Sequence, residues 1–132
     1  MGRAFLIAVV AGALVPAAVA SEKRGFAFGR VGGNIRPYTV SITNDGVVRV
    51  SGAVEVGRMK LTLAQLAELN RVASVTRFTA LPLATSCTGT LPDVAATFIR
   101  VGARTVRVHG NCVPRYSRLW KALTSAVKVS NA

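Results

Sequence analysis

The sequence predicts an α+β domain in which two helices pack on one face of an antiparallel sheet. Two observations carry this prediction. Paired segments alternate apolar and polar residues around short turns, and two other segments repeat apolar residues at helical spacing. Hairpins separated by helices give the order β-β-α-β-β-α, which is typical of a sheet covered on one face. We therefore expect one ββαββα domain over 37–132, preceded by a signal peptide over 1–20 and a flexible, glycine-rich arm over 21–36.

The first twenty residues have the pattern of a secretory signal peptide. Arg3 supplies a positive charge, an apolar run follows, and a small-residue cleavage pattern ends at Ala20, so that the mature chain would begin at Ser21. The alternative is a membrane anchor, which needs about 20 apolar residues. The run over 4–20 is shorter and contains Pro16, and no later run is long enough to span a bilayer. We expect a secreted, extracytoplasmic protein with no membrane span after cleavage, and the Arg-, Ala- and Val-rich composition indicates a bacterial source.

The first predicted hairpin spans residues 38–51. Residues 38–43 alternate apolar and polar side chains, as in a strand with one buried face. Asn44-Asp45-Gly46 is a hairpin turn signal because these residue types tolerate positive φ. Residues 47–51 then return as the second strand.

The pattern next changes to a helical period. Four apolar residues recur at that spacing: Leu63, Leu66, Leu69 and Ala73. Thr62 and Gln65 fit a capping box, in which each side chain satisfies a backbone N–H of the first turn. Because Pro82 cannot propagate a helix, we expect one amphipathic helix over about 62–75.

The second half of the chain repeats this arrangement. Residues 94–101 and 105–109 are the expected strands, joined by a short turn at 102–104. A C-terminal helix follows, with one apolar stripe made of Tyr116, Leu119, Trp120, Leu123 and Val127. The expected core is Val40, Ile42, Val48, Val50, Leu66, Leu69, Val106, Val108, Leu119 and Leu123.

Cys87 and Cys112 are the two cysteines, and in an exported domain an even count favours one disulfide. One alternative is a metal site that also uses His109. Two thiols and one imidazole supply only three ligands, and a disulfide consumes two of them. The other alternative is a Cys112 nucleophile with His109 as its base, for which no third orienting group is evident. We expect structural cysteines, no metal and no cofactor.

The supply of reactive side chains is small: one histidine, two cysteines and five acidic residues in 132 residues. It argues against an EF-hand or a paired-carboxylate hydrolase, so we expect no catalytic residues and no enzyme. By contrast, 17 basic residues give a formal net charge of +12. A chain that is 51% hydrophobic is also too apolar to remain disordered. We therefore expect a folded, basic binding module.

The positive charge is expected to gather on one face of the sheet. In strands that turn their valines to the core, Arg49, Arg107 and His109 would point to the opposite face. Further arginines are expected at its rim: Arg36, Arg58, Arg100 and Arg104. We predict that Arg36, Arg49, Arg100, Arg107 and His109 bind an acidic protein or an anionic envelope polymer. The alternative is a face that only keeps a basic protein in solution.

Nucleic acid is a less favoured partner for this charge. Export separates the protein from cytoplasmic nucleic acid. The aromatic residues that could stack on bases, Tyr38, Tyr116 and Trp120, are expected to face the core.

Several local features recur together along residues 30–127. They are Gly32-Gly33 ahead of a strand, the segments 38–46 and 61–66, a helix exit at Phe78-Thr79-Ala80-Leu81-Pro82, Cys87 ahead of Pro92-Asp93, and a final helix with Trp120. This pattern resembles emfourin-type inhibitors of bacterial thermolysin-like metalloproteases and similar small exported domains of unknown function. The resemblance implies an α+β fold and a protease as partner. The chain departs from that family over 32–36, the segment that the resemblance would place against a protease.

We therefore expect a secreted, disulfide-stapled, basic binding module with a protease-inhibitor-like role. The alternative is a structural protein of the cell envelope that binds anionic polymer through the arginine-rich face of the sheet.

Overall fold

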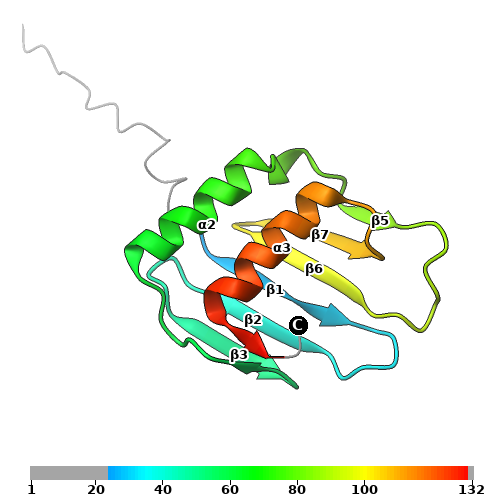
Figure 1. The fold of residues 1–132 in the computed structure, drawn as a ribbon, viewed down its shortest axis with the longest axis horizontal. Helices are drawn as coiled ribbons and strands as arrows, with labels where there is room; N and C mark the ends of the chain where they lie inside the picture. The colour runs from blue at the N-terminus through cyan, green and yellow to red at the C-terminus, as the bar shows by residue number, and fades with distance from the viewer. Residues whose placement is uncertain (1–23, 131–132) are drawn as a thin grey trace, which may run out of the picture.

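Both helices lie on the same face of a six-stranded sheet (Figure 1). The structure, a computed structural model, describes residues 24–130, and the predicted signal peptide and its cleavage between Ala20 and Ser21 lie outside them. The strand order is β3-β2-β1-β6-β7-β5, antiparallel throughout except for the parallel pair β5–β7. The strands are β1 (Phe26–Val31), β2 (Tyr38–Ile42), β3 (Val48–Gly52), β5 (Ala84–Ser86), β6 (Ala96–Val101) and β7 (Arg104–His109).

The remaining elements join or cover this sheet. The helices are α2 (Leu63–Val75) and α3 (Pro114–Val127), with a 3-10 turn, η1 (Phe78–Ala80), after α2. A second, two-stranded sheet pairs β4 (Glu55–Val56) with β8 (Val129–Ser130). The α+β class, the two helices and the mostly antiparallel sheet agree with the prediction. The order differs from ββαββα because β1, β4, β5 and β8 are additional strands.

The predicted flexible arm over 21–36 is wrong for its central part. Residues 26–31 form β1, which lies between β2 and β6 in the interior of the sheet. Phe26 and Phe28 of this strand are 1% and 0% exposed, and fully burying a side chain of this size contributes about 1.5–3 kcal/mol. That gain outweighs the conformational freedom that Gly29 loses in a strand. The glycines of the segment therefore do not make it an arm.

The core fills the space between the sheet and the two helices. Of the expected core residues, all but Val50 are buried, and Val50 is partly exposed on the edge strand β3. The largest buried side chains that the sequence analysis did not include are Phe26, Phe28, Leu61, Phe78, Leu81 and Ile99. Trp120 of α3 packs edge-on against Phe28, with ring centroids 5.5 Å apart. This contact joins α3 to the central strand.

Helix α2 begins as predicted. Thr62 Oγ1 accepts a hydrogen bond from the Gln65 backbone N–H, and Gln65 Oε1 accepts one from the Thr62 backbone N–H, at 3.2 and 2.9 Å. This capping box satisfies two backbone donors that have no partner within the helix. The residues of the predicted apolar stripe are buried except Leu63. Leu63 lies in the first turn of the helix, where no described residue covers it, and is 81% exposed.

The predicted disulfide between Cys87 and Cys112 is confirmed. It links the loop after β5 to the loop between β7 and α3, with the two Cα atoms 5.7 Å apart. Both sulfur atoms are therefore bonded, which removes the alternatives of a metal ligand and a Cys112 nucleophile. Within residues 24–130, no three His, Cys, Asp or Glu side chains come together as a metal site would require. No helix in this range is long and apolar enough to cross a membrane.

Candidate functional site

The face of the sheet turned away from α2 and α3 is the candidate site, and we call it the open face. The strand register defines its residues, because alternate residues of each strand point to it. They are Ala27, Gly29, Val31, Thr39, Ser41, Arg49, Ser51, Ala84, Ser86, Ala96, Phe98, Arg100, Thr105, Arg107 and His109. No helix covers this face in the described part of the chain (Figure 1).

The open face carries uncompensated positive charge. Arg49, Arg100 and Arg107 are all exposed on it, and none of its strand positions holds an aspartate or a glutamate. The side chains of these three arginines make no hydrogen bond or ion pair with any described residue. The ion pair found within residues 24–130 joins Arg71 to Glu68 on α2, where the hydrogen bond from Arg71 lowers the pKa of Glu68. The guanidinium groups of the open face are therefore available to an outside anion.

Arg49 and Arg100 border one shallow hollow of about 230 Å³. Both belong to a row that crosses the sheet through Ser41 and Ala27. Three strand spacings separate β3 from β6, about 14 Å at the usual spacing, and two extended arginine side chains can span most of this distance. The Ser41 hydroxyl lies between them. Two guanidinium groups and a hydroxyl are donors suited to a carboxylate or a phosphate.

Arg107 lies in the neighbouring row, beside an aromatic ring. It stands opposite Phe98 in the β6–β7 pair, and Phe98 stands opposite Gly29 in the β1–β6 pair. Phe98 is not among the residues predicted for this face, because only polar residues are expected on the exposed side of a sheet. The strand parity contained the signal, since Phe98 is two residues from Arg100 and therefore shares its face.

His109 lies at the margin of the open face, and one of its ring nitrogens bonds within the fold. Its Nε2 atom lies 2.8 Å from the carbonyl oxygen of Val94. Because a carbonyl oxygen only accepts, Nε2 carries the proton. The backbone carbonyl of His109 also accepts a 2.8 Å hydrogen bond from the Cys87 N–H. His109 therefore anchors both ends of the loop between Cys87 and Val94, at the margin of the open face.

Three arginines that were predicted at the rim of this face lie away from it. Arg36 is exposed in the loop between β1 and β2, outside the strands that define the face. Arg58 Nη1 donates a 2.8 Å hydrogen bond to the Ala126 carbonyl, and Arg104 Nη2 donates one of 2.6 Å to the Leu81 carbonyl. The last two side chains therefore join elements of the fold. Of the residues predicted to bind an anion, the open face holds Arg49, Arg100, Arg107 and His109, and Arg36 lies outside it.

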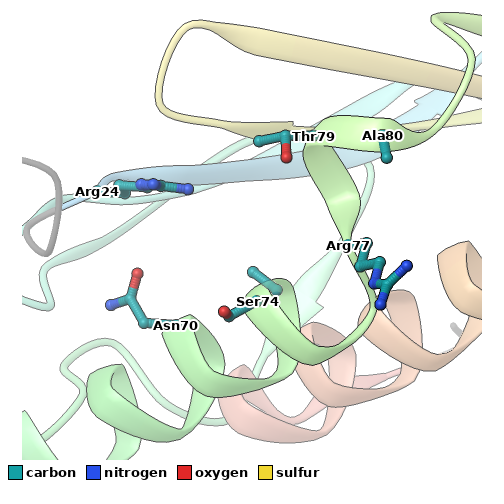
Figure 2. Close-up of a pocket in the computed structure, with 7 residues that line it drawn as sticks. Arg24, Asn70, Ser74, Arg77, Thr79 and Ala80 are labelled. Carbon is teal, nitrogen blue, oxygen red and sulfur yellow. The ribbon is translucent and has the colours of Figure 1, made fainter.

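A second basic hollow, of about 420 Å³, lies between the start of β1 and the end of α2. In Figure 2, Arg24 lies across the hollow from Asn70 and Ser74, while Arg77 lies on the far side of Ser74. The amide of Asn70 is already engaged as a donor to the Leu66 carbonyl, at 3.0 Å. This hollow is also at the carboxyl end of α2, where the helix dipole disfavours an anion. The open face is therefore the better anion site.

Comparison of the chain with protein-family models, with curated proteins and with solved structures finds no match. The function is therefore inferred from the geometry and chemistry of the open face.

Proposed function

We propose that this protein is a non-catalytic, extracytoplasmic binding module that holds an anionic polymer of the cell envelope, or an acidic protein, on the open face of its sheet. The observation that carries the proposal is the exposure of Arg49, Arg100 and Arg107 on a face whose strand positions hold no carboxylate. The Cys87–Cys112 disulfide supports a location outside the reducing cytoplasm.

The spacing of the arginines favours an extended partner. Arg49 lies on β3 and Arg100 on β6, three strands away, whereas Ala27 on β1 between them is buried. A single exposed ion pair contributes about 0–1 kcal/mol, so three separate arginines bind well only when one partner engages them together. A flexible polyanion can do this, and its binding should weaken steeply with salt because exposed charges are screened over about 10 Å at 0.1 M ionic strength.

Binding of the purified, oxidised protein to polyglutamate and to polygalacturonate at 0.05 and 0.5 M salt tests the proposal. The test variant is Arg49→Gln/Arg100→Gln/Arg107→Gln. The matched control is Arg115→Gln/Arg118→Gln/Lys121→Gln, which removes the same charge from exposed positions of α3.

The open-face variant should lose at least tenfold in affinity at low salt, and the α3 variant less than threefold. Equal losses in the two variants would mean that net charge alone drives binding, and would contradict the proposal.

A second candidate function, inhibition of a secreted metalloprotease, is supported by the loop from Cys87 to Val94. The disulfide and the His109–Val94 hydrogen bond fix this loop, which exposes Leu91 and Val94 by 64% and 46%. A pre-ordered loop with apolar side chains loses little entropy when it enters a protease cleft.

Titration of thermolysin activity with the native protein and with Leu91→Asp/Val94→Asp tests this second function. Inhibition by the native protein but not by the variant would support the inhibitor function. Full protease activity in the presence of equimolar native protein would rule the inhibitor function out.

A further inference from the structure

One aromatic ring interrupts the polar surface of the open face. Phe98 is partly exposed, and it is the one aromatic residue among the strand positions of this face. A Cβ atom added to Gly29 would lie 2.9 Å from Phe98 Cε1, so the ring occupies the space that a side chain of β1 would fill. Packing on the backbone of β1 therefore holds the ring in place while solvent still reaches it.

Arginines flank this ring on two sides. Arg100 follows Phe98 by two residues on the same strand, and Arg107 stands directly across from it on β7. Both arginines are exposed. This combination suits a ligand that has a flat apolar surface with an oxyanion attached to it. The C–H face of a sugar ring can rest on the electron-rich face of an aromatic ring, while a carboxylate on that sugar accepts hydrogen bonds from guanidinium groups.

We infer that the anionic polymer held by the open face is an acidic polysaccharide, with a sugar ring stacked on Phe98 and its carboxylates paired with Arg100 and Arg107. This inference rests on the proposed function and gives it a ligand class. Arg49, at the other side of the sheet, then takes a carboxylate further along the polymer. An extended chain that crosses the strands reaches all four side chains.

Single-stranded nucleic acid also combines flat rings with anions, but the open face fits it less well. Sheets that bind single strands use aromatic side chains to stack two or three bases. Phe98 alone offers one platform. The disulfide also supports a compartment in which polysaccharide, rather than nucleic acid, is the usual polyanion.

The experiment compares two carboxylate polymers, one with sugar rings and one without. Binding of polygalacturonate and of polyglutamate is measured for the native protein, for Phe98→Leu and for Phe98→Tyr. Leucine keeps apolar volume over Gly29 but removes the ring, whereas tyrosine keeps the ring. Phe98→Leu should weaken polygalacturonate binding about five- to tenfold, with polyglutamate binding changed less than twofold, and Phe98→Tyr should bind both polymers as the native protein does. Thermal unfolding of each variant gives the folded fraction used to correct each affinity.

The outcomes separate this inference from the proposed function. If Arg49→Gln/Arg100→Gln/Arg107→Gln binds both polymers as tightly as the native protein, the proposed function fails and the inference with it. If that variant binds both polymers more weakly but Phe98→Leu binds both as tightly as the native protein, the proposed function stands and the polysaccharide inference is wrong. If Phe98→Leu weakens a single-stranded oligodeoxynucleotide more than polygalacturonate, the ligand is nucleic acid and the inference is again wrong.

Discussion

The guanidinium group of Arg58 donates a 2.8 Å hydrogen bond to the carbonyl oxygen of Ala126, in the last turn of α3. The last carbonyls of a helix have no partner within it, and a cation there also faces the negative end of the helix dipole. Arg104 similarly donates to the Leu81 carbonyl, just after η1. These arginines stabilise the fold, whereas the side chains of Arg49, Arg100 and Arg107 bond to no described residue.

This difference predicts that substitutions in the first group of arginines lower the stability of the protein and that substitutions in the second group do not. Arg58→Gln and Arg104→Gln should each lower the free energy of unfolding by about 1–3 kcal/mol, because each leaves a carbonyl without its charged donor. Arg49→Gln should change stability by about 0.5 kcal/mol or less, as exposed substitutions usually do. Urea unfolding of each variant measures both effects. An Arg58→Gln protein that is as stable as the native one would show that the hydrogen bond to Ala126 contributes nothing.

Gly29 should not tolerate even one added methyl group. A Cβ at this position would meet the carbonyl oxygen of Tyr38 and lie 2.9 Å from Phe98 Cε1. Because backbone atoms of β2 would have to move, Gly29→Ala should cost about 3 kcal/mol, at the upper end for overpacking. The control is Gly89→Ala, where φ is +83° and nothing lies within 4 Å of the added Cβ. Its cost should be about 1–2 kcal/mol from backbone conformation alone. Equal losses of stability for the two variants would contradict this assignment.

Two buried tyrosines should respond differently to loss of their hydroxyl groups. The Tyr116 hydroxyl lies 2.8 Å from Thr97 Oγ1, whereas the Tyr38 hydroxyl has no hydrogen-bond partner among the described residues. Tyr116→Phe should therefore cost about 1 kcal/mol, the usual net value of one hydrogen bond. Tyr38→Phe should be neutral or stabilising. Urea unfolding at pH 8 compares them, and a larger loss in Tyr38→Phe would reverse the assignment.

The same tyrosines predict a loss of stability in alkali. Burial raises the pKa of Tyr116, an effect that the hydrogen bond with Thr97 reduces only in part, and burial also raises the pKa of Tyr38. The unfolded chain releases these protons near the ordinary tyrosine pKa of about 10, while the native protein retains them. Their contribution to stability is therefore complete below pH 10 and falls as the pH rises above it.

Tyr116→Phe should make this alkaline loss less steep without abolishing it, because Tyr38 still titrates. Unfolding midpoints in urea at pH 8, 10 and 11 measure the slope. An unchanged slope in the variant would contradict a raised pKa for Tyr116.

The elements that the sequence predicts are those whose signals are local. The strand over 38–42 alternates because one of its faces is buried, and the start of α2 is set by Thr62 and Gln65 three residues apart. Strand β1 lacks such a signal. Its core face holds Phe26 and Phe28, but its open face holds Ala27 and Gly29, which no pattern of polar residues marks. Its place between β2 and β6 depends on contacts with residues far along the chain.

The candidate site was predictable to a similar extent. Strand parity alone places Arg49 and Arg107 on the open face. It cannot reveal that Arg58 and Arg104 bond to carbonyl groups, or that His109 turns to Val94, because each acceptor is brought near by the tertiary fold. Phe98 is a different case, because strand parity places it on the face of Arg100, but a phenylalanine is expected in the core unless a residue as small as Gly29 opposite it makes room for its ring.

The Cys87–Cys112 disulfide should hold the short edge strand β5 against β7. That pairing spans only three residues, Ala84–Ser86, and the chain immediately after it is fixed by the disulfide. Closing a loop between cysteines 25 residues apart should contribute about 3 kcal/mol to stability. Reduction of the native protein should therefore lower the free energy of unfolding by about this amount and speed hydrogen exchange over 84–94. Cys87→Ser/Cys112→Ser should show the same loss and no further response to reductant. A native protein that keeps its stability and its slow exchange after reduction would mean that the backbone pairing alone holds this edge of the sheet.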